Sequence, residues 1–350
     1  MKTLKEAYKG LFTVGAAVSA HWLDEAAETV REQFDTVTCE NEMKYNSIHP
    51  HDYPRPDLWA LRHGETPEPP EVTRRERFVS PSLETDFGPG DKIYGFAKEN
   101  GLLIRGHNLM WHASYPWGIF EQLTADEIMS NTREHFGQVA EHYPDCYCWD
   151  VVNEAIDDKH GGYLRETVFK EKLGEDYLFR MYALAREFFP GKLLCCNDYN
   201  EFSPQKRDNI LKLVGALKER GLVDVIGCQC HLNAMMTDKD YDNMRRGFEM
   251  YASTGLRLHV TELDVNAVDW KNPDAVPADD LENRVTEAYR RIFGIFREFS
   301  SAIDNVTLWG VSDRHSWLNH FKNAEKRKNA PLLFDDEYKP KAALQAVIDF

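Results

Sequence analysis

The chain has 350 residues, of which 42% are apolar, so it can build a sizeable core. A charged fraction of 29% without low-complexity runs argues against disorder. The formal net charge of −16 disfavours nucleic acid and anionic membranes as partners, and no apolar run approaches the ~20 residues of a membrane span.

The first predicted element lies in residues 10–20, an apolar stretch with strand-like alternation. It is too short for a signal-peptide core and follows the acidic Glu6, so we interpret it as a strand. A signal peptide cleaved from a precursor would leave no trace in this sequence. The expectation of a cytoplasmic protein therefore depends on its cysteines.

Short β-type runs occur eight times, and segments with helical spacing separate them. The runs span residues 12–19, 36–42, 102–111, 146–154, 192–199, 224–232, 257–265 and 305–313. Strands that alternate with helices pair in parallel, and eight such units predict an α/β fold, a (β/α)8 TIM barrel. The alternative is an open doubly wound sheet, but no Gly-x-Gly-x-x-Gly follows the first run. We predict one catalytic domain over residues 1–350.

A proline-rich insertion interrupts the alternation after the second strand. Residues 47–81 hold seven of the sixteen prolines and show neither helical nor strand periodicity. Loops of this length are usually functional or disordered. Because the insertion follows the carboxyl end of a strand, we expect it beside the active site, with Tyr53 and Trp59 as spare aromatic side chains.

Two helices carry terminal signals. Thr124 and Glu127 form a capping-box pattern, and a later helix over 204–220 has Ser203 as its N-cap and Pro204 at its first position. The buried face of that later helix is predicted to hold Ile210, Leu211, Leu213, Val214 and Leu217. The chain closes with a predicted helix over 341–349.

The seven cysteines all lie in apolar strand-like runs: Cys39, Cys146, Cys148, Cys195, Cys196, Cys228 and Cys230. A disulfide framework would place them in the loops of a smaller chain, so we expect reduced thiols and a cytoplasmic location. Two C-x-C pairs leave a zinc site as the alternative, since residues i and i+2 share a face of a strand. The more economical interpretation is that they are small buried hydrophobes and that no metal is bound.

Acids, amides, imidazoles and indoles gather where the predicted strands end, which is where barrel enzymes place catalytic residues. These residues are Glu40, Asn41, Lys44, His107, Trp111, Asn153, Glu154, Asn197, Tyr199, Gln229, His231, Glu262, Asp264 and Trp309. Glu154 and Glu262 are the candidates for chemistry. Two carboxylates ~5–5.5 Å apart are what retaining glycoside hydrolysis requires, although either glutamate alone fits a salt bridge at the rim.

Seven motifs resemble those of glycoside hydrolase family 10, the xylanases. They are TCENEMK at 38–44, RGHNLMWH at 105–112, WDVVNEA at 149–155, NDYNE at 197–201, IGCQCHL at 226–232, HVTELDV at 259–265 and WGVSD at 309–313. The resemblance implies an endo-acting, retaining β-1,4-xylanase without a cofactor or metal. It is closest in style to short single-domain intracellular members.

The resemblance also implies roles for individual residues. Glu154 would be the acid/base and Glu262 the nucleophile, with His231 between Glu262 and Asp264. Asn153 would hold the sugar 2-hydroxyl. The remaining substrate-binding residues would be Glu40, Asn41, Lys44, His107, Trp111, Asn197, Tyr199, Gln229, Trp309 and Trp317.

The chain departs from the family pattern at three positions. Ser114 stands where glutamine is usual, Trp117 is shifted by one residue, and Cys230 replaces a small residue. The alternatives are a retaining β-1,4-glucanase or mixed-specificity enzyme, and a non-catalytic carbohydrate-binding barrel. The sequence leaves side-branch preference and oligomeric state open.

Overall fold

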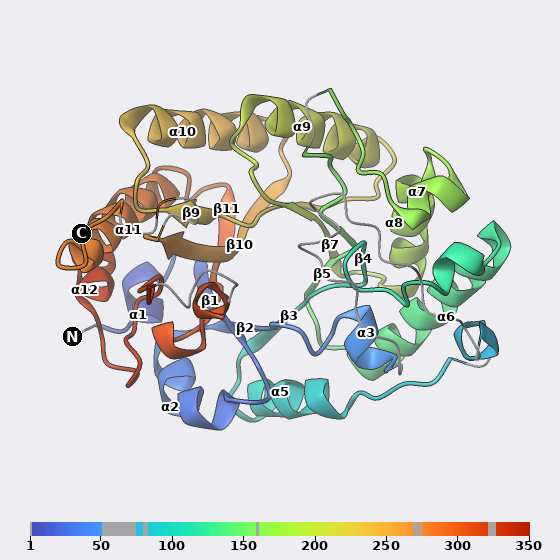
Figure 1. Cartoon of the computed structure of the whole chain (residues 1–350), viewed down its shortest axis with the longest axis horizontal. Helices are drawn as coiled ribbons and strands as arrows, with labels where there is room; N and C mark the ends of the chain where they lie inside the picture. The colour runs from blue at the N-terminus through green and yellow to red at the C-terminus, as the bar shows by residue number, and fades with distance from the viewer. Residues whose placement is uncertain are drawn as a thin grey trace.

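The first and last strands of the sheet lie side by side in this computed structural model, so the sheet closes on itself (Figure 1). β1 (Thr13–Val18) pairs in parallel with β11 (Ile303–Leu308). The structure describes residues 2–50, 75–79, 83–158, 161–268, 272, 275–320 and 327–350. Within these ranges eight parallel strands form the barrel, which confirms the predicted (β/α)8 fold.

The other barrel strands follow one another in chain order around the sheet. They are β2 (Thr36–Cys39), β3 (Leu103–Gly106), β5 (Cys148–Asp150), β7 (Leu193–Asp198), β8 (Val225–Cys228) and β10 (Arg257–Asn266). Three predicted strands prove to be divided, because their backbone leaves the barrel and pairs again at the rim. β4 (Met110–Trp111) pairs with β6 (Val152–Asn153), and β9 (His231–Asn233) pairs with the end of β10.

Helices surround the strands (Figure 1). Their bounds are α1 (Leu4–Tyr8), α2 (Leu23–Gln33), α3 (Tyr45–Ile48), α5 (Gly88–Glu99), α6 (Ala125–His142), α7 (Val168–Leu173), α8 (Tyr177–Phe188), α9 (Pro204–Lys218), α10 (Asp238–Ser253), α11 (Leu281–Glu298) and α12 (Ala342–Ile348). Short 3-10 turns cover Arg75–Phe78, Phe120–Gln122, Asp313–His315 and Trp317–Asn319. The Tyr8 hydroxyl donates to the Val347 carbonyl at 2.5 Å, which joins the two ends of the chain.

The helix signals read from the sequence agree with the structure in position. Thr124 and Glu127 form the capping box of α6, and α9 begins at Pro204. Ser203 occupies the N-cap of α9, but its side chain makes no capping hydrogen bond. Along α9 the residues Ile210, Leu213, Val214 and Leu217 are buried, whereas Leu211 is only partly buried.

The interior of the barrel is polar along part of its axis. Asn305 Nδ2 donates to the Oγ1 atoms of Thr13 and Thr36, at 3.0 and 3.2 Å, and Thr307 Oγ1 donates to Asn305 Oδ1 at 2.7 Å. Gly15 leaves room for this cluster, because a Cβ atom there would lie 2.1 Å from Thr36 Oγ1. Buried polar groups that satisfy one another in this way give the barrel a specific register.

Most of the proline-rich insertion, with Tyr53 and Trp59, lies outside the described residues, so its expected place beside the active site remains a prediction. Among its described residues, Arg75–Phe78 form a 3-10 turn in which the side chain of Phe78 is buried. All seven cysteines are buried and free. Among the described helices, none has the length and apolar character that crossing a membrane requires.

Candidate active site

Glu154 and Glu262 lie at the carboxyl end of the barrel, joined by amide side chains. Asn197 Nδ2 donates to Glu262 Oε1 at 2.8 Å and to Asn153 Oδ1 at 2.9 Å. Gln229 Nε2 donates to Glu154 Oε1 at 3.3 Å. Both carboxyl groups belong to residues that are about 95% buried, with 6% of Glu154 and 5% of Glu262 exposed. The network therefore fixes both carboxylates at the rim.

Glu154 holds a backbone conformation that side-chain-bearing residues rarely adopt. Its φ is 58°, in the left-handed region. Its N–H donates to the Asn197 carbonyl at 2.9 Å, and its own carbonyl accepts from Arg165 Nε at 3.0 Å. Strain of this kind persists only where neighbours impose it, and it is concentrated at functional sites. Here this conformation turns the chain immediately after the end of β6, at the rim of the barrel.

One oxygen of Glu154 is available for chemistry. Oε1 accepts from Gln229, while Oε2 is buried without a hydrogen-bond partner among the described residues. His112 Nε2 lies 3.9 Å from Oε2, beyond hydrogen-bonding distance. A buried carboxyl oxygen without a partner is costly unless a ligand or water meets it.

Glu262 is held as a carboxylate by an imidazole. His231 Nε2 donates to Glu262 Oε2 at 3.3 Å, and His231 Nδ1 donates to Asp264 Oδ2 at 3.0 Å. Burial raises the pKa of Glu262, but the His231 hydrogen bond and the neighbouring imidazoles outweigh it and bring that pKa below its usual value. Burial lowers the pKa of His231, yet Asp264 and Glu262 raise it well above normal. Trp317 Nε1 donates to Asp264 Oδ2 at 2.7 Å and so fixes the carboxylate that orients His231.

A buried ion pair positions His107 beside this group. Arg105 and Asp150 are fully buried, and the guanidinium donates to both Asp150 oxygens. The same carboxylate accepts from His107 Nδ1 at 2.8 Å. The centres of the His107 and Trp309 rings are 5.1 Å apart, and the rings meet edge to face. Burial raises the pKa of Asp150, but Arg105 and His107 hold it well below its usual range.

Lys44 lies among aromatic and acidic side chains. Its Nζ donates to Asn41 Oδ1 at 2.9 Å and lies 4.9 Å from the centre of the Trp111 ring. Burial lowers the pKa of Lys44, while four carboxylates, led by Glu262, raise it only in part. Burial likewise raises the pKa of Glu40, which Lys44 lowers in part. Trp111 Nε1 is buried without a partner in the described part of the chain, so a bound hydroxyl is a suitable acceptor.

A cleft of about 740 Å³ continues from these residues along the rim. Its lining residues are Ser19, His21, Trp22, Glu40, Asn41, His315, Trp317 and His320. The Trp22 and His315 rings are stacked, with centroids 5.2 Å apart and an interplanar angle of 7°. The volume of the cleft is large enough for more than one sugar ring, and Glu40 and Asn41 form part of its lining.

Tyr199 belongs to a charged cluster that Arg165 connects to the backbone carbonyl of Glu154. The Tyr199 hydroxyl donates to Asp158 and accepts from Arg165 at 3.0 Å, while Lys206 Nζ lies 4.2 Å from its ring centre and 2.6 Å from Asp158 Oδ1. Burial raises the pKa of Asp158, but Lys206 and Tyr199 bring it to about 2. Burial also raises the pKa of Asp198 to about 6, although Lys206 at 2.9 Å opposes the shift.

Hydrogen bonds, ring contacts and the shared cleft connect every site residue predicted from the sequence. Sequence reasoning gave no role to Arg105, Asp150, Asp158, Arg165 or Lys206, which hold those residues in place. Arg105 and Asp150 carried a usable signal, since each is a charged residue inside an otherwise apolar strand. The cluster around Tyr199 carried none, because its members come from separate segments.

The three departures from the family pattern have different settings. Ser114 is buried, and its Oγ accepts from the Asn46 N–H at 3.1 Å, so it supports the backbone after β2. Cys230 has a φ of 57°, and its N–H donates to the buried Glu201 carboxylate at 2.9 Å. Because Cys230 lies between Gln229 and His231 in the chain, its hydrogen bond helps to orient both of these residues. Nothing in the structure explains the shift of Trp117.

Comparison with known proteins gives consistent matches over the whole length. The sequence model of glycosyl hydrolase family 10 matches residues 3–350. Endo-1,4-beta-xylanase B of Paenibacillus barcinonensis is 35% identical over 356 residues, covering 99% of this chain and 97% of that relative. Endo-1,4-beta-xylanase A of Caldicellulosiruptor saccharolyticus is 34% identical over 360 residues, covering 99% and 96%.

Solved structures of similar proteins have the same fold. Xylanase XynB from Paenibacillus barcinonensis, complexed with a conduramine derivative, has a TM-score of 0.86 at 34% identity and covers 99% of this chain and 98% of its own. The endo-1,4-beta-xylanase from Caldicellulosiruptor owensensis has a TM-score of 0.86 at 32% identity and covers 100% of both chains.

Proposed function

The chain belongs to glycosyl hydrolase family 10, and from this premise we propose that it is an endo-1,4-β-xylanase acting by double displacement. The observation that carries the proposal is the hydrogen-bonded connection from Glu154 through Gln229, Asn153 and Asn197 to Glu262. Two carboxylates in different surroundings are the requirement for this reaction. The relatives named above are all xylanases, which favours xylose over glucose as the sugar.

In the first step the Glu262 carboxylate attacks the anomeric carbon. The His231 hydrogen bond keeps this carboxylate ionised. As the glycosidic C–O bond breaks, Glu154 delivers its proton to the leaving oxygen through Oε2, its unpartnered oxygen. A xylosyl ester of Glu262 results, and the reducing-end fragment leaves as an alcohol.

In the second step Glu154, now ionised, takes a proton from water. The water oxygen attacks the anomeric carbon on the face that the leaving group vacated, and the bond to Glu262 breaks. Two inversions give a product with the β configuration. Glu154 regains its proton, so the cycle balances without another reagent.

The remaining site residues position the sugar. Asn153 suits the 2-hydroxyl, because its Oδ1 is fixed by Asn197 between the two glutamates. Lys44, Glu40 and Asn41 would bind the next xylose at the entrance of the 740 Å³ cleft. The Trp309 indole would pack on the ring at the cleaved bond, since indole faces and sugar C–H faces complement each other.

Initial rates on aryl β-xylobioside and aryl β-cellobioside, together with NMR of the first product, test the proposal. We expect the xylobioside to react much faster and the β-anomer to form first. An initial α-anomer would disprove double displacement, and faster cellobioside cleavage would establish the glucanase alternative. No hydrolysis of either would leave the carbohydrate-binding barrel as the explanation.

We also propose that the protein works in the cytoplasm. The support is that seven buried cysteines remain free, which suits a reducing compartment. Cell fractionation with an antibody against the chain tests this, and recovery outside the cell would contradict it.

A further inference from the structure

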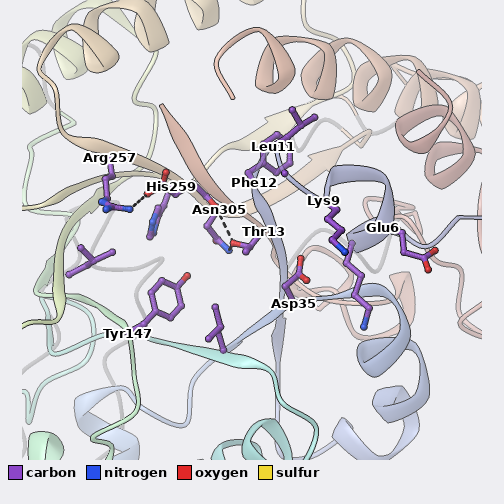
Figure 2. Close-up of a pocket in the computed structure, with 15 residues that line it drawn as sticks. Glu6, Lys9, Leu11, Phe12, Thr13, Asp35, Tyr147, Arg257, His259 and Asn305 are labelled. Atoms are coloured by element: carbon purple, nitrogen blue, oxygen red, sulfur yellow. Dashed lines mark hydrogen bonds and ion pairs between the residues drawn. The ribbon is translucent and has the colours of Figure 1, made fainter. Parts of the chain in front are cut away.

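A second pocket lies at the opposite end of the barrel from Glu154 and Glu262, where the strands begin (Figure 2). Its volume is about 680 Å³, and α1 with the turn after it forms one side. The lining residues are Lys5, Glu6, Lys9, Gly10, Leu11, Phe12, Thr13, Asp35, Leu103, Tyr147, Leu193, Arg257, His259, Asp304 and Asn305. None of them belongs to the site described above.

Two buried polar atoms at this pocket have no hydrogen-bond partner in the described part of the chain: the Tyr147 hydroxyl and His259 Nδ1. The two rings are 6.1 Å apart, and only 1% of His259 is exposed. Figure 2 shows the Tyr147 hydroxyl directed toward the middle of the pocket. Buried polar groups are nearly always satisfied, so these two atoms are suited to an occupant that offers hydrogen bonds.

Apolar side chains form the wall of the pocket near its mouth. Leu11 and Leu103 are 36% and 50% exposed, and they are two of the three exposed large apolar side chains among the described residues. Phe12 and Leu193 lie beside them in the lining. A concave surface that is mostly apolar with a few polar atoms at its base is typical of small-molecule sites.

The charges around the pocket balance. Three basic and three acidic residues line it: Lys5, Lys9, Arg257, Glu6, Asp35 and Asp304. Arg257 is paired with Asp304 at 2.5 Å, and the Lys5 Nζ donates to the Arg31 carbonyl at 2.5 Å. Asp35 Oδ2 accepts from the Val14 N–H at 3.0 Å. A strongly charged ligand would therefore gain little here, and a neutral one fits better.

We propose that this pocket binds one neutral sugar ring of pentopyranose size, as a second carbohydrate site separate from the active site. A sugar hydroxyl both donates and accepts, so it satisfies the Tyr147 hydroxyl and His259 Nδ1 in either imidazole tautomer. The C–H face of the ring packs against Leu103 and the Tyr147 ring. The proposal rests on the proposed function only for the choice of xylose as the sugar.

NMR of protein labelled in its leucine methyl groups tests the proposal, because Leu103 and Leu193 report on the pocket directly. The active site is first blocked with an activated 2-deoxy-2-fluoro-xyloside, which esterifies the nucleophile. Methyl β-D-xyloside is then titrated. We expect saturable shifts of the Leu103 and Leu193 methyl groups and none for Leu211, on the outer helix α9.

Tyr147→Phe is the matched variant, because it removes one hydroxyl and keeps the ring. We expect it to weaken methyl xyloside binding at the pocket about fivefold, the loss of one neutral hydrogen bond, while hydrolysis by the unblocked enzyme stays unchanged. Its thermal unfolding temperature should be equal to or higher than that of the wild type, since the hydroxyl has no partner to lose within the described residues.

Unmoved pocket methyl groups, or equal affinity in Tyr147→Phe, would overturn the proposal. Shifts with phenol but not with methyl xyloside would also overturn it, because the pocket would then take apolar rings. If the proposed function were wrong, the result would differ, because the fluoro-sugar would not label Glu262. The methyl shifts of Leu103 on titration with methyl xyloside would still decide whether the second site exists.

Discussion

Glu154 and Glu262 sit in different surroundings, and truncating each should cause a different failure. Glu262→Ala removes the nucleophile, so even an activated aryl xyloside should lose nearly all turnover. Glu154→Ala removes proton donation, which an activated aryl leaving group does not need, so the xylosyl ester should still form. Added azide should then accelerate turnover of Glu154→Ala and yield a β-xylosyl azide, measured by NMR.

The control for this pair is Glu187→Ala, which removes an exposed glutamate paired with Arg133 at the surface. It should leave rates on aryl and polymeric substrates unchanged. An α-azide from Glu154→Ala would reverse the two assignments, because a single displacement by azide would mean that the substitution had removed the nucleophile.

His231 should set the acid limb of the pH profile. Its hydrogen bond lowers the pKa of Glu262, so the wild-type enzyme should keep kcat/KM at pH values where an ordinary glutamate is protonated. His231→Ala removes a charged donor worth roughly 1.5–3 kcal/mol, so the acid limb should move up by about one to two pH units. The pH dependence of kcat/KM measures the shift.

The sign of that shift separates an electrostatic role from a structural one. A merely destabilised variant would lose activity at all pH values without moving the limb. His142→Ala, which breaks a surface pair with Asp91, is the matched control and should leave the limb in place. A limb that moves to lower pH in His231→Ala would show that the imidazole does not stabilise the carboxylate.

At the scale of the elements, β8 provides the space that Asn197 of β7 requires. A Cβ atom at Gly227 would lie 2.6 Å from Asn197 Oδ1 and 2.7 Å from Cys195 Sγ. Gly227→Ala should therefore displace the amide that bridges Asn153 and Glu262, and lower kcat/KM roughly 10- to 100-fold. Steady-state kinetics on an aryl xylobioside measures the loss.

Gly215→Ala is the matched substitution for Gly227→Ala. It lies in α9, where an added Cβ meets nothing within 4 Å. It should raise the free energy of unfolding by roughly 0.5–1 kcal/mol and leave kinetics unchanged. Equal kinetics in both variants would show that Asn197 tolerates displacement.

The proline-rich insertion is the element whose removal should change substrate range. Its flanks are tied together, since the Asp86 N–H donates to the Ile48 carbonyl at 2.7 Å and the His49 ring donates to the Glu84 carbonyl at 2.7 Å. Replacing residues 51–74 with a Gly–Ser linker of about ten residues keeps these bonds and the buried Phe78. We expect unchanged rates on aryl xylosides and a changed ratio of polymer to oligosaccharide hydrolysis. An unchanged ratio in a folded variant would show that the segment does not border the cleft.

For the molecule as a whole, the sequence predicted the barrel because alternating periods of two and 3.6 residues encode it directly. The polar residues at the strand ends could be predicted for the same reason, as β10 shows with Glu262 and Asp264 following an apolar run. Predicted strands such as 102–111 were too long, because periodicity does not reveal where a backbone leaves the barrel ladder and pairs again at the rim.

What the sequence did not predict depends on contacts between distant residues. Arg105 and Asp150 lie 45 positions apart, and Lys206 lies 48 positions from Asp158, so no local pattern links them. The pocket at the amino end of the barrel is also beyond sequence reasoning, since Tyr147 and His259 read as ordinary strand residues. Only the closed barrel brings their two unpartnered atoms together.

The net charge of −16 should make hydrolysis of acidic xylan depend on salt. An anionic chain repels a polymer that carries uronate side groups, and salt screens this repulsion over a Debye length of about 10 Å at 0.1 M. kcat/KM on uronate-bearing xylan should therefore rise between low and physiological ionic strength, while kcat/KM on neutral xylo-oligosaccharides stays constant. Initial rates on both substrates in the same buffers measure this, with the neutral substrate as control. A decrease on the acidic polymer would mean that local cations such as Lys44 and Arg165, rather than the overall charge, govern the approach of substrate.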